Sequence, residues 1–217
     1  MAKSSKPNAR KAAKSTARKK PRVVPKLKIF VASTVYNFED QLRQICGVLT
    51  SLGYDVWNSH LGTVPVNPAR SNRENCIAAV DACDVFLGLI RPFYGSGVIG
   101  ARSITHDECL RAIQGTKPRW FMVHRDVVFA RQLLKPYMLT EDGQPNPSFA
   151  FRKTSVMDDG RVIDLYNAAL QSEIPAEERR GHWVQEFYRQ HELLDYVNTQ
   201  FADIARIRAI CEEMRRR

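Results

Sequence analysis

The chain has 217 residues and a formal net charge of +10 at pH 7, from 33 Lys and Arg against 23 Asp and Glu. Eleven of the basic residues lie in residues 1–28, which contain no acid, so residues 29–217 carry 22 basic and 23 acidic side chains. The positive charge therefore belongs to the leader, and the rest of the chain does not require a basic face for reading DNA. No apolar run approaches the ~20 residues that span a bilayer, which argues against a membrane partner.

The cysteines indicate the compartment. The chain has five cysteines, an odd number, and they form no CxxC and no zinc-finger spacing: Cys46, Cys76, Cys83, Cys109 and Cys211. The N-terminus also lacks the apolar segment of a secretory signal. We therefore expect a cytoplasmic protein without structural disulfides and without a metal site.

The leader predicts a disordered basic tail over residues 1–26. It consists mainly of Ala, Lys, Arg, Ser and Pro and offers little apolar surface to offset the entropy of ordering. Two functions remain open: residues 1–28 bind nucleic acid or an acidic partner non-specifically, or they only aid solubility. An organelle transit peptide is a weaker third alternative, because the segment has no apolar helical stripe.

The first predicted elements alternate between strand and helix. Residues 27–32 are typical of a buried strand. Apolar residues at helical spacing over 38–52 predict a helix, and Gly53 follows where a C-terminal glycine belongs. Residues 54–57 then form a second short strand.

A second helix and a central strand follow. Ser71 is expected to cap the helix, with Glu74 three residues later. Residues 85–90 are apolar without alternation, which predicts a strand covered on both faces. A third helix is expected to start near Ser103.

The remaining strands complete the predicted sheet. Residues 119–124 predict a fourth strand, residues 127–134 a short helix, and residues 148–151 a fifth strand. Strands that alternate with helices indicate a parallel α/β sheet with right-handed crossovers. We expect a flavodoxin-like sheet of about five strands.

The C-terminal region has a different pattern. From Val184 onward, apolar residues recur every three or four positions without Gly or Pro, which predicts a helix over 184–217 or two helices with a break near Thr199. The apolar stripe must cover the α/β body or a second copy of the chain. We expect three regions: a tail over 1–26, an α/β domain over 27–152 and a helical C-terminal extension over 153–217.

A ligand is expected where the strand order of such a sheet reverses, beyond the carboxyl ends of the first and third strands. Ser33 and Thr34 leave the first strand with hydroxyls and free backbone N–H groups. Tyr94 and Gly95 belong to a loop after the third strand, and a glycine there permits close approach of the backbone. Glu108 lies near the start of the following helix and faces the same crevice.

These segments carry a resemblance. The order of residues 28–34, 52–56, 84–90, 94–95 and 103–108 resembles the TIR-like domains of bacterial proteins of unknown function. That family is similar to TIR domains and, more distantly, to nucleoside 2-deoxyribosyltransferases. The resemblance covers residues 27–134, about half of the chain, and makes 27–152 a TIR-like domain.

The resemblance implies cleavage of the N-glycosidic bond of NAD or a related nucleotide by a bacterial stress or antiviral effector. It implies that Glu108 is the catalytic carboxylate and that NAD is a substrate, with no cofactor. Residues 104–107 differ from many catalytic TIR domains, which have Trp or another bulky residue there. The implied nucleotide-binding residues are Ser33, Thr34, Phe93, Tyr94, Gly95 and Ser103.

Two other interpretations remain. A Glu in the first turns of a helix is favoured by the helix dipole alone, so Glu108 need not be catalytic. The chain is then a non-catalytic signalling module that self-associates through its TIR-like domain or through the helix over 184–217. The basic tail would tether such a module to nucleic acid.

Overall fold

The computed structural model describes residues 24–95, 98–99, 102–179 and 181–216. Most of the predicted basic tail therefore lies outside the described residues. The main sheet has five parallel strands in the order β2-β1-β3-β6-β7. They are β1 (Lys28–Ser33), β2 (Asp55–Trp57), β3 (Val85–Ile90), β6 (Arg119–His124) and β7 (His182–Phe187). This order confirms the flavodoxin-like sheet.

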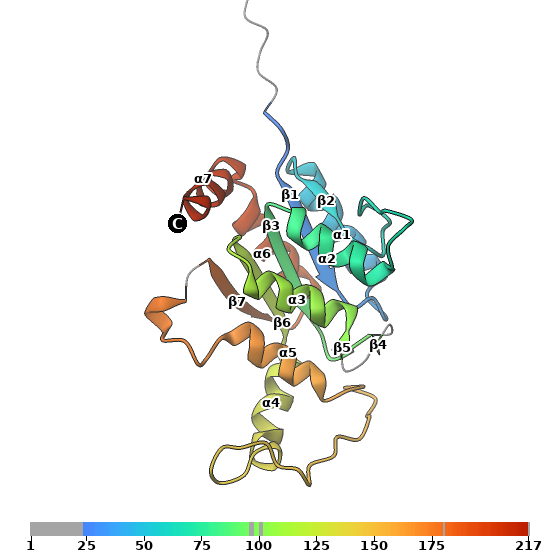
Figure 1. The fold of residues 1–217 in the computed structure, drawn as a ribbon, viewed down its shortest axis with the longest axis vertical. Helices are drawn as coiled ribbons and strands as arrows, with labels where there is room; N and C mark the ends of the chain where they lie inside the picture. Colours follow the sequence, from blue (N-terminus) through green and yellow to red (C-terminus); the bar gives the residue numbers. More distant parts are fainter. Residues whose placement is uncertain (1–23, 96–97, 100–101, 180, 217) are drawn as a thin grey trace, which may run out of the picture.

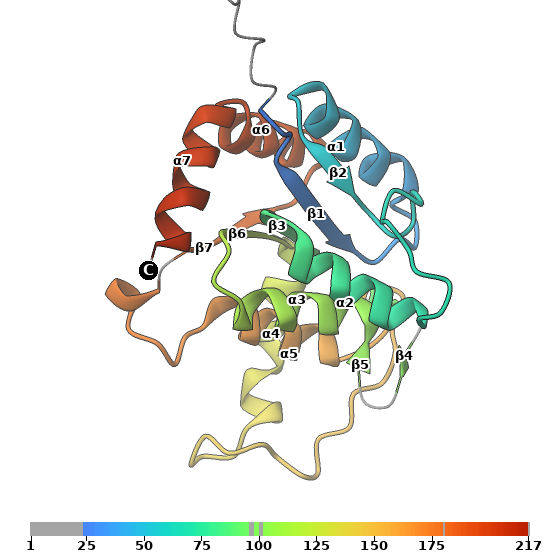
Figure 2. The same cartoon turned by 45° about the horizontal axis from the view of Figure 1, so that its top comes forward.

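Helices cover both faces of the sheet. Figure 2 shows the two helical layers on either side of the sheet. The first layer contains α1 (Glu39–Ser51), α6 (Gln190–Phe201) and α7 (Ile204–Arg215), and the second contains α2 (Asn72–Ala82), α3 (Ile104–Gln114) and α5 (Arg161–Leu170). A further helix, α4 (Arg125–Met138), leaves the carboxyl end of β6 and extends away from the sheet (Figure 1). Short elements complete the described chain: β4 (Val98–Ile99), β5 (Arg102–Ser103) and the 3-10 turn η1 (Ala176–Glu178).

Each central strand is buried on both faces, which explains its continuous apolar sequence. Phe30 and Phe86 belong to the core under α2 and α3. Val31 and Leu87, one position later on the same strands, belong to the core under α1 and α6. The Ser71–Glu74 capping box at the start of α2 is also confirmed.

Two sequence predictions about the second half were wrong. Residues 148–151 form no strand, and the fifth strand is β7, which pairs with β6 from His182 to Phe187. Over 184–217 the single continuous helix is wrong, because residues 184–187 end β7, while the alternative of two helices with a break near Thr199 is confirmed by α6 and α7. The break between these helices falls at Ala202 and Asp203, and the Asp203 side chain caps α7 by accepting from the Arg206 amide N–H.

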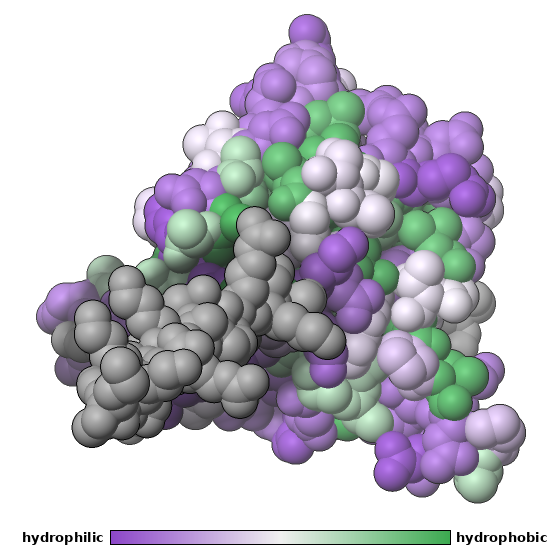
Figure 3. Space-filling model, turned by 90° about the horizontal axis from the view of Figure 1, so that it is seen from above, coloured by the Kyte–Doolittle hydropathy of each residue, from purple (hydrophilic) through white to green (hydrophobic). Residues whose placement is uncertain are grey.

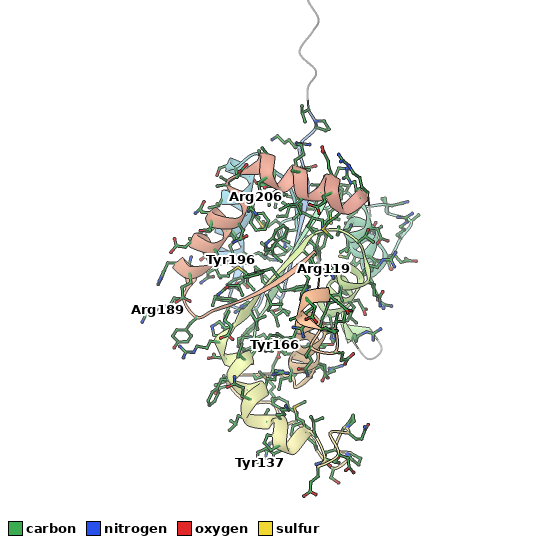
Figure 4. All side chains as sticks on the ribbon, turned by 90° about the vertical axis from the view of Figure 1, so that its left-hand side faces the viewer. Arg119, Tyr137, Tyr166, Arg189, Tyr196 and Arg206 are labelled. Atoms are coloured by element: carbon green, nitrogen blue, oxygen red, sulfur yellow. The ribbon has the colours of Figure 1, made fainter. Side chains whose placement is uncertain are left out.

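The physical reason is that six residues of mixed polarity fit a strand as well as a helix, so pairing with a distant partner decides. In Figure 4, β7 forms the near edge of the sheet, between Tyr196 of α6 and Tyr166 of α5. Residues 153–217 thus supply a strand of the main sheet as well as helices.

The strands of the sheet begin near the top of the view in Figure 1. Figure 3 shows the molecule from that side, where hydrophobic residues are interspersed among hydrophilic ones. No helix among the described residues is long and apolar enough to cross a membrane. The carboxyl ends open on the opposite side, where a cavity lies.

Candidate functional site

A cavity of about 920 Å³ lies beyond the carboxyl ends of β1 and β3. This is the point where the strand order reverses, which is where the sequence analysis expects a ligand. Five segments contribute to its wall: the β1–α1 loop, the β2–α2 loop with the start of α2, the loop that leaves β3, the first turns of α3, and the loop around residues 153–158. Its lining includes Ser33, Thr34, Tyr36, Asn75, Cys76, Phe93, Gly95, Glu108, Lys153 and Asp158.

Glu108 is the buried carboxyl group of this cavity. Helix α3 begins after Ser103, whose hydroxyl accepts from the His106 amide N–H and fixes the first turn. Glu108 follows on the next turn and is only 2% exposed. Its Oε1 and the Oγ1 of Thr34 are buried, and neither has a hydrogen-bond partner in the described part of the chain. Because buried polar atoms are normally paired, these two are available to a ligand.

Burial governs the ionisation of Glu108. Loss of solvent raises its pKa to about 7, a hydrogen bond from the Cys76 thiol opposes this shift, and the charge of Asp107 adds to it. Burial and the neighbouring Glu108 raise the pKa of Cys76 to about 12, so that thiol stays neutral. Asp107 itself is held away from the site by Arg73 at 2.6 Å and Arg102 at 2.8 Å.

Five of the seven residues predicted for the site line the cavity. They are Glu108, Ser33, Thr34, Phe93 and Gly95. Gly95 has φ +90°, and a Cβ there would lie 3.0 Å from Cγ2 of Thr34. A glycine is therefore required at position 95 by the packing of the loop after β3 against the β1–α1 loop, independently of any ligand.

Tyr94 and Ser103 lie outside the cavity lining. Tyr94 is 2% exposed. Its hydroxyl lies 2.6 Å from Nδ1 of His106 and accepts from the Ser103 amide N–H at 3.3 Å. The contacts of Tyr94 with His106 and Ser103 therefore connect the loop that leaves β3 to the start of α3, behind the cavity wall. In this position Tyr94 cannot stack on a base in the cavity.

Sequence reasoning missed Arg91, which shapes the β1–α1 loop. Its Nη1 donates to the carbonyl oxygens of Thr34 at 3.3 Å and Tyr36 at 2.9 Å. The guanidinium also lies 4.1 Å from the ring centre of Phe38. Burial lowers the pKa of Arg91 to about 10, so it remains a cation at neutral pH. Nothing in the sequence distinguishes this Arg from one that is exposed after a strand.

Two further parts of the wall were also missed. Asn75 and Cys76 come from α2, and Lys153 and Asp158 from a segment that follows α4 by many residues. Only the folded topology brings them to Glu108. Among the described residues, no three His, Cys, Asp or Glu side chains come together as metal ligands.

The sheet order and the cavity at its switch point define a flavodoxin-like α/β protein with a ligand-sized site. Residues 28–202 match DUF4062, a domain of unknown function, and the chain belongs to this family. No curated protein matches the chain.

One solved structure with a similar chain is described as "Structure of Clostridium botulinum CMP N-glycosidase, BcmB". The two chains are 13% identical, with a TM-score of 0.42 over 80% of this chain and 98% of the other. A similarity at this level does not bear on the function of the present protein.

Proposed function

We propose that the cavity binds a nucleotide and that Glu108 assists cleavage of its N-glycosidic bond. The observation that carries this proposal is that Glu108 lines the cavity and that its Oε1 atom is buried without a hydrogen-bond partner among the described residues. A carboxylate in such surroundings interacts strongly with a positive charge that develops beside it.

The chemistry requires such a group. When the bond between C1′ and the base nitrogen breaks, its electron pair leaves with the base and positive charge develops on the ribose. The Glu108 carboxylate stabilises this charge or attacks C1′ directly. Water then supplies a hydroxyl group to C1′, and its other proton passes to the departing base or to solvent.

An aromatic pair in the cavity wall suits the base. Tyr36 and Phe93 both line the cavity, and their ring centres are 5.1 Å apart. A flat nucleobase or nicotinamide stacks favourably on such rings. NAD is the first candidate substrate because of the resemblance to TIR-like domains, and the proposed role is that of a bacterial stress or antiviral effector.

Release of free base from a panel of nucleotides tests the proposal. We expect the wild type to release base from at least one of NAD, AMP, GMP, CMP and UMP, and Glu108→Gln to reduce turnover roughly 10²–10⁴-fold. Because the pKa of Glu108 is raised to about 7 and the carboxylate is the reactive form, turnover should rise as the pH increases through 7.

Glu178→Gln is the matched control, since Glu178 is exposed and does not line the cavity. It should leave turnover unchanged. Chromatographic measurement of the free base decides the outcome. Equal turnover by wild type and Glu108→Gln would remove Glu108 from the mechanism, and no release from any member of the panel would contradict the proposed activity.

A further inference from the structure

The turn over residues 153–158 is a fixed part of the cavity wall. Oγ1 of Thr154 accepts from the backbone N–H groups of Val156 at 3.2 Å and Met157 at 3.0 Å. The Thr154 N–H in turn donates to the Met157 carbonyl at 2.8 Å. Met157 is 3% exposed and belongs to the core under α3 and α5. The turn is therefore closed internally and anchored by a buried side chain.

Two hydrogen bonds hold the same turn against the loop that leaves β3. The Asp158 N–H donates to the Pro92 carbonyl at 3.3 Å. Oδ1 of Asp158 accepts from the Tyr94 N–H at 2.7 Å. Phe93, which lines the cavity, lies between these two contacts in sequence. The position of the turn relative to the aromatic wall is thus set by the fold.

Two polar side chains of this turn have no structural task. Lys153 and Ser155 are exposed and line the cavity. Neither forms a hydrogen bond or an ion pair with any residue in the described ranges, whereas Thr154 and Asp158 are both used. An ammonium group and a hydroxyl on one turn of the cavity wall suit an anionic ligand group, above all a phosphate.

The geometry of a nucleotide connects this turn to Glu108. In a nucleotide the base is attached to C1′, and the 5′-phosphate is attached through C5′ to C4′, on the other side of the ring oxygen. If C1′ lies at the buried carboxylate, electrostatic repulsion favours a phosphate placed away from Glu108, at the exposed rim. Lys153 lies at that rim and supplies the opposite charge.

We infer that Lys153 and Ser155 bind the 5′-phosphate of the substrate, so that the site selects 5′-phosphorylated ribonucleosides over free nucleosides. This inference rests on the proposed function and specifies its substrate class. NAD belongs to the class, because its nicotinamide ribose carries a 5′-phosphoryl group.

The test compares AMP, GMP, CMP and UMP with their nucleosides in the wild type, Lys153→Gln and Ser155→Ala. We expect Lys153→Gln to lower kcat/KM for the monophosphate that turns over by roughly tenfold or more, mainly through KM, and to leave the nucleoside unchanged. Ser155→Ala should have a smaller effect in the same direction. Lys135→Gln, which changes an exposed Lys of α4 outside the cavity, should have none.

Equal losses on monophosphate and nucleoside, or no loss in Lys153→Gln, would overturn the inference while the proposed function stands. If the wild type releases base from none of these compounds and not from NAD either, the proposed function fails. Calorimetric titration with the four monophosphates still decides the inference in that case, and also where NAD alone is cleaved. Binding that weakens roughly tenfold in Lys153→Gln supports it. Binding that is unchanged, or absent in the wild type, overturns it.

Discussion

Replacement of Glu108 by Gln is expected to stabilise the protein at pH 8 far more than at pH 5. Burial raises the pKa of this carboxyl to about 7 in the folded protein, against an ordinary value of 4.5. The unfolded chain therefore ionises first, and the wild type loses stability as the pH rises from 4.5 to 7. The loss is about 3 kcal/mol at pH 8 and less than about 1 kcal/mol at pH 5.

Gln removes this cost because it carries no charge and keeps an oxygen that accepts from Cys76. Thermal unfolding followed by circular dichroism at pH 5 and pH 8 measures the difference, which should be several degrees in Tm at pH 8.

Burial also lowers the pKa of His106 and His182 to about 4, but both histidines are present in each protein, so their effects cancel in the comparison. Glu178→Gln is the control. An identical pH dependence in wild type and Glu108→Gln would show that Glu108 is not a buried, uncompensated carboxyl.

Arg91→Met should cost about 2–4 kcal/mol of unfolding free energy, because it leaves buried carbonyl oxygens without donors. Arg91 is 8% exposed, and its guanidinium donates to the backbone carbonyl oxygens of Thr34 and Tyr36 in the β1–α1 loop. Met retains much of the apolar stem and so isolates the loss of the guanidinium. Since Thr34 and Tyr36 line the cavity, nucleotide binding should weaken as well.

Urea unfolding measures the change in stability. Arg43→Met is the matched control, because Arg43 is an exposed Arg on α1 and should change stability by no more than about 0.5 kcal/mol. If Arg91→Met falls within that same range, the described hydrogen bonds do not hold the loop.

The sequence contained enough to predict the first half of the fold. β1, β3 and β6 are mainly continuous apolar runs. The apolar residues of α1 recur at helical spacing, so this helix is predicted from its own sequence alone. β7 was missed because its residues alternate only weakly and its strand character depends on β6, about 60 residues earlier in the chain. Residues 148–151 have the local composition of a strand, but local composition does not decide which segments pair.

The candidate site was predictable to the same extent. Thr34 and Glu108 follow from the order of the strands, because the carboxyl ends of neighbouring parallel strands meet at one edge of the sheet. Arg91 and Lys153 reach the cavity through tertiary contacts that no local pattern encodes. Tyr94 was expected in the nucleotide site, but its hydroxyl pairs with His106 and the ring is buried behind the wall.

The most direct test of the central claim is a titration of Glu108 itself. Carboxyl signals of Glu labelled with carbon-13 are followed by NMR from pH 4 to pH 9, and the signal missing in Glu108→Gln identifies the residue. We predict a titration midpoint near 7, from the raised pKa of this group, and a displaced midpoint when the nucleotide that turns over is added. A midpoint near the ordinary value of 4.5 that nucleotides leave unchanged would contradict the account.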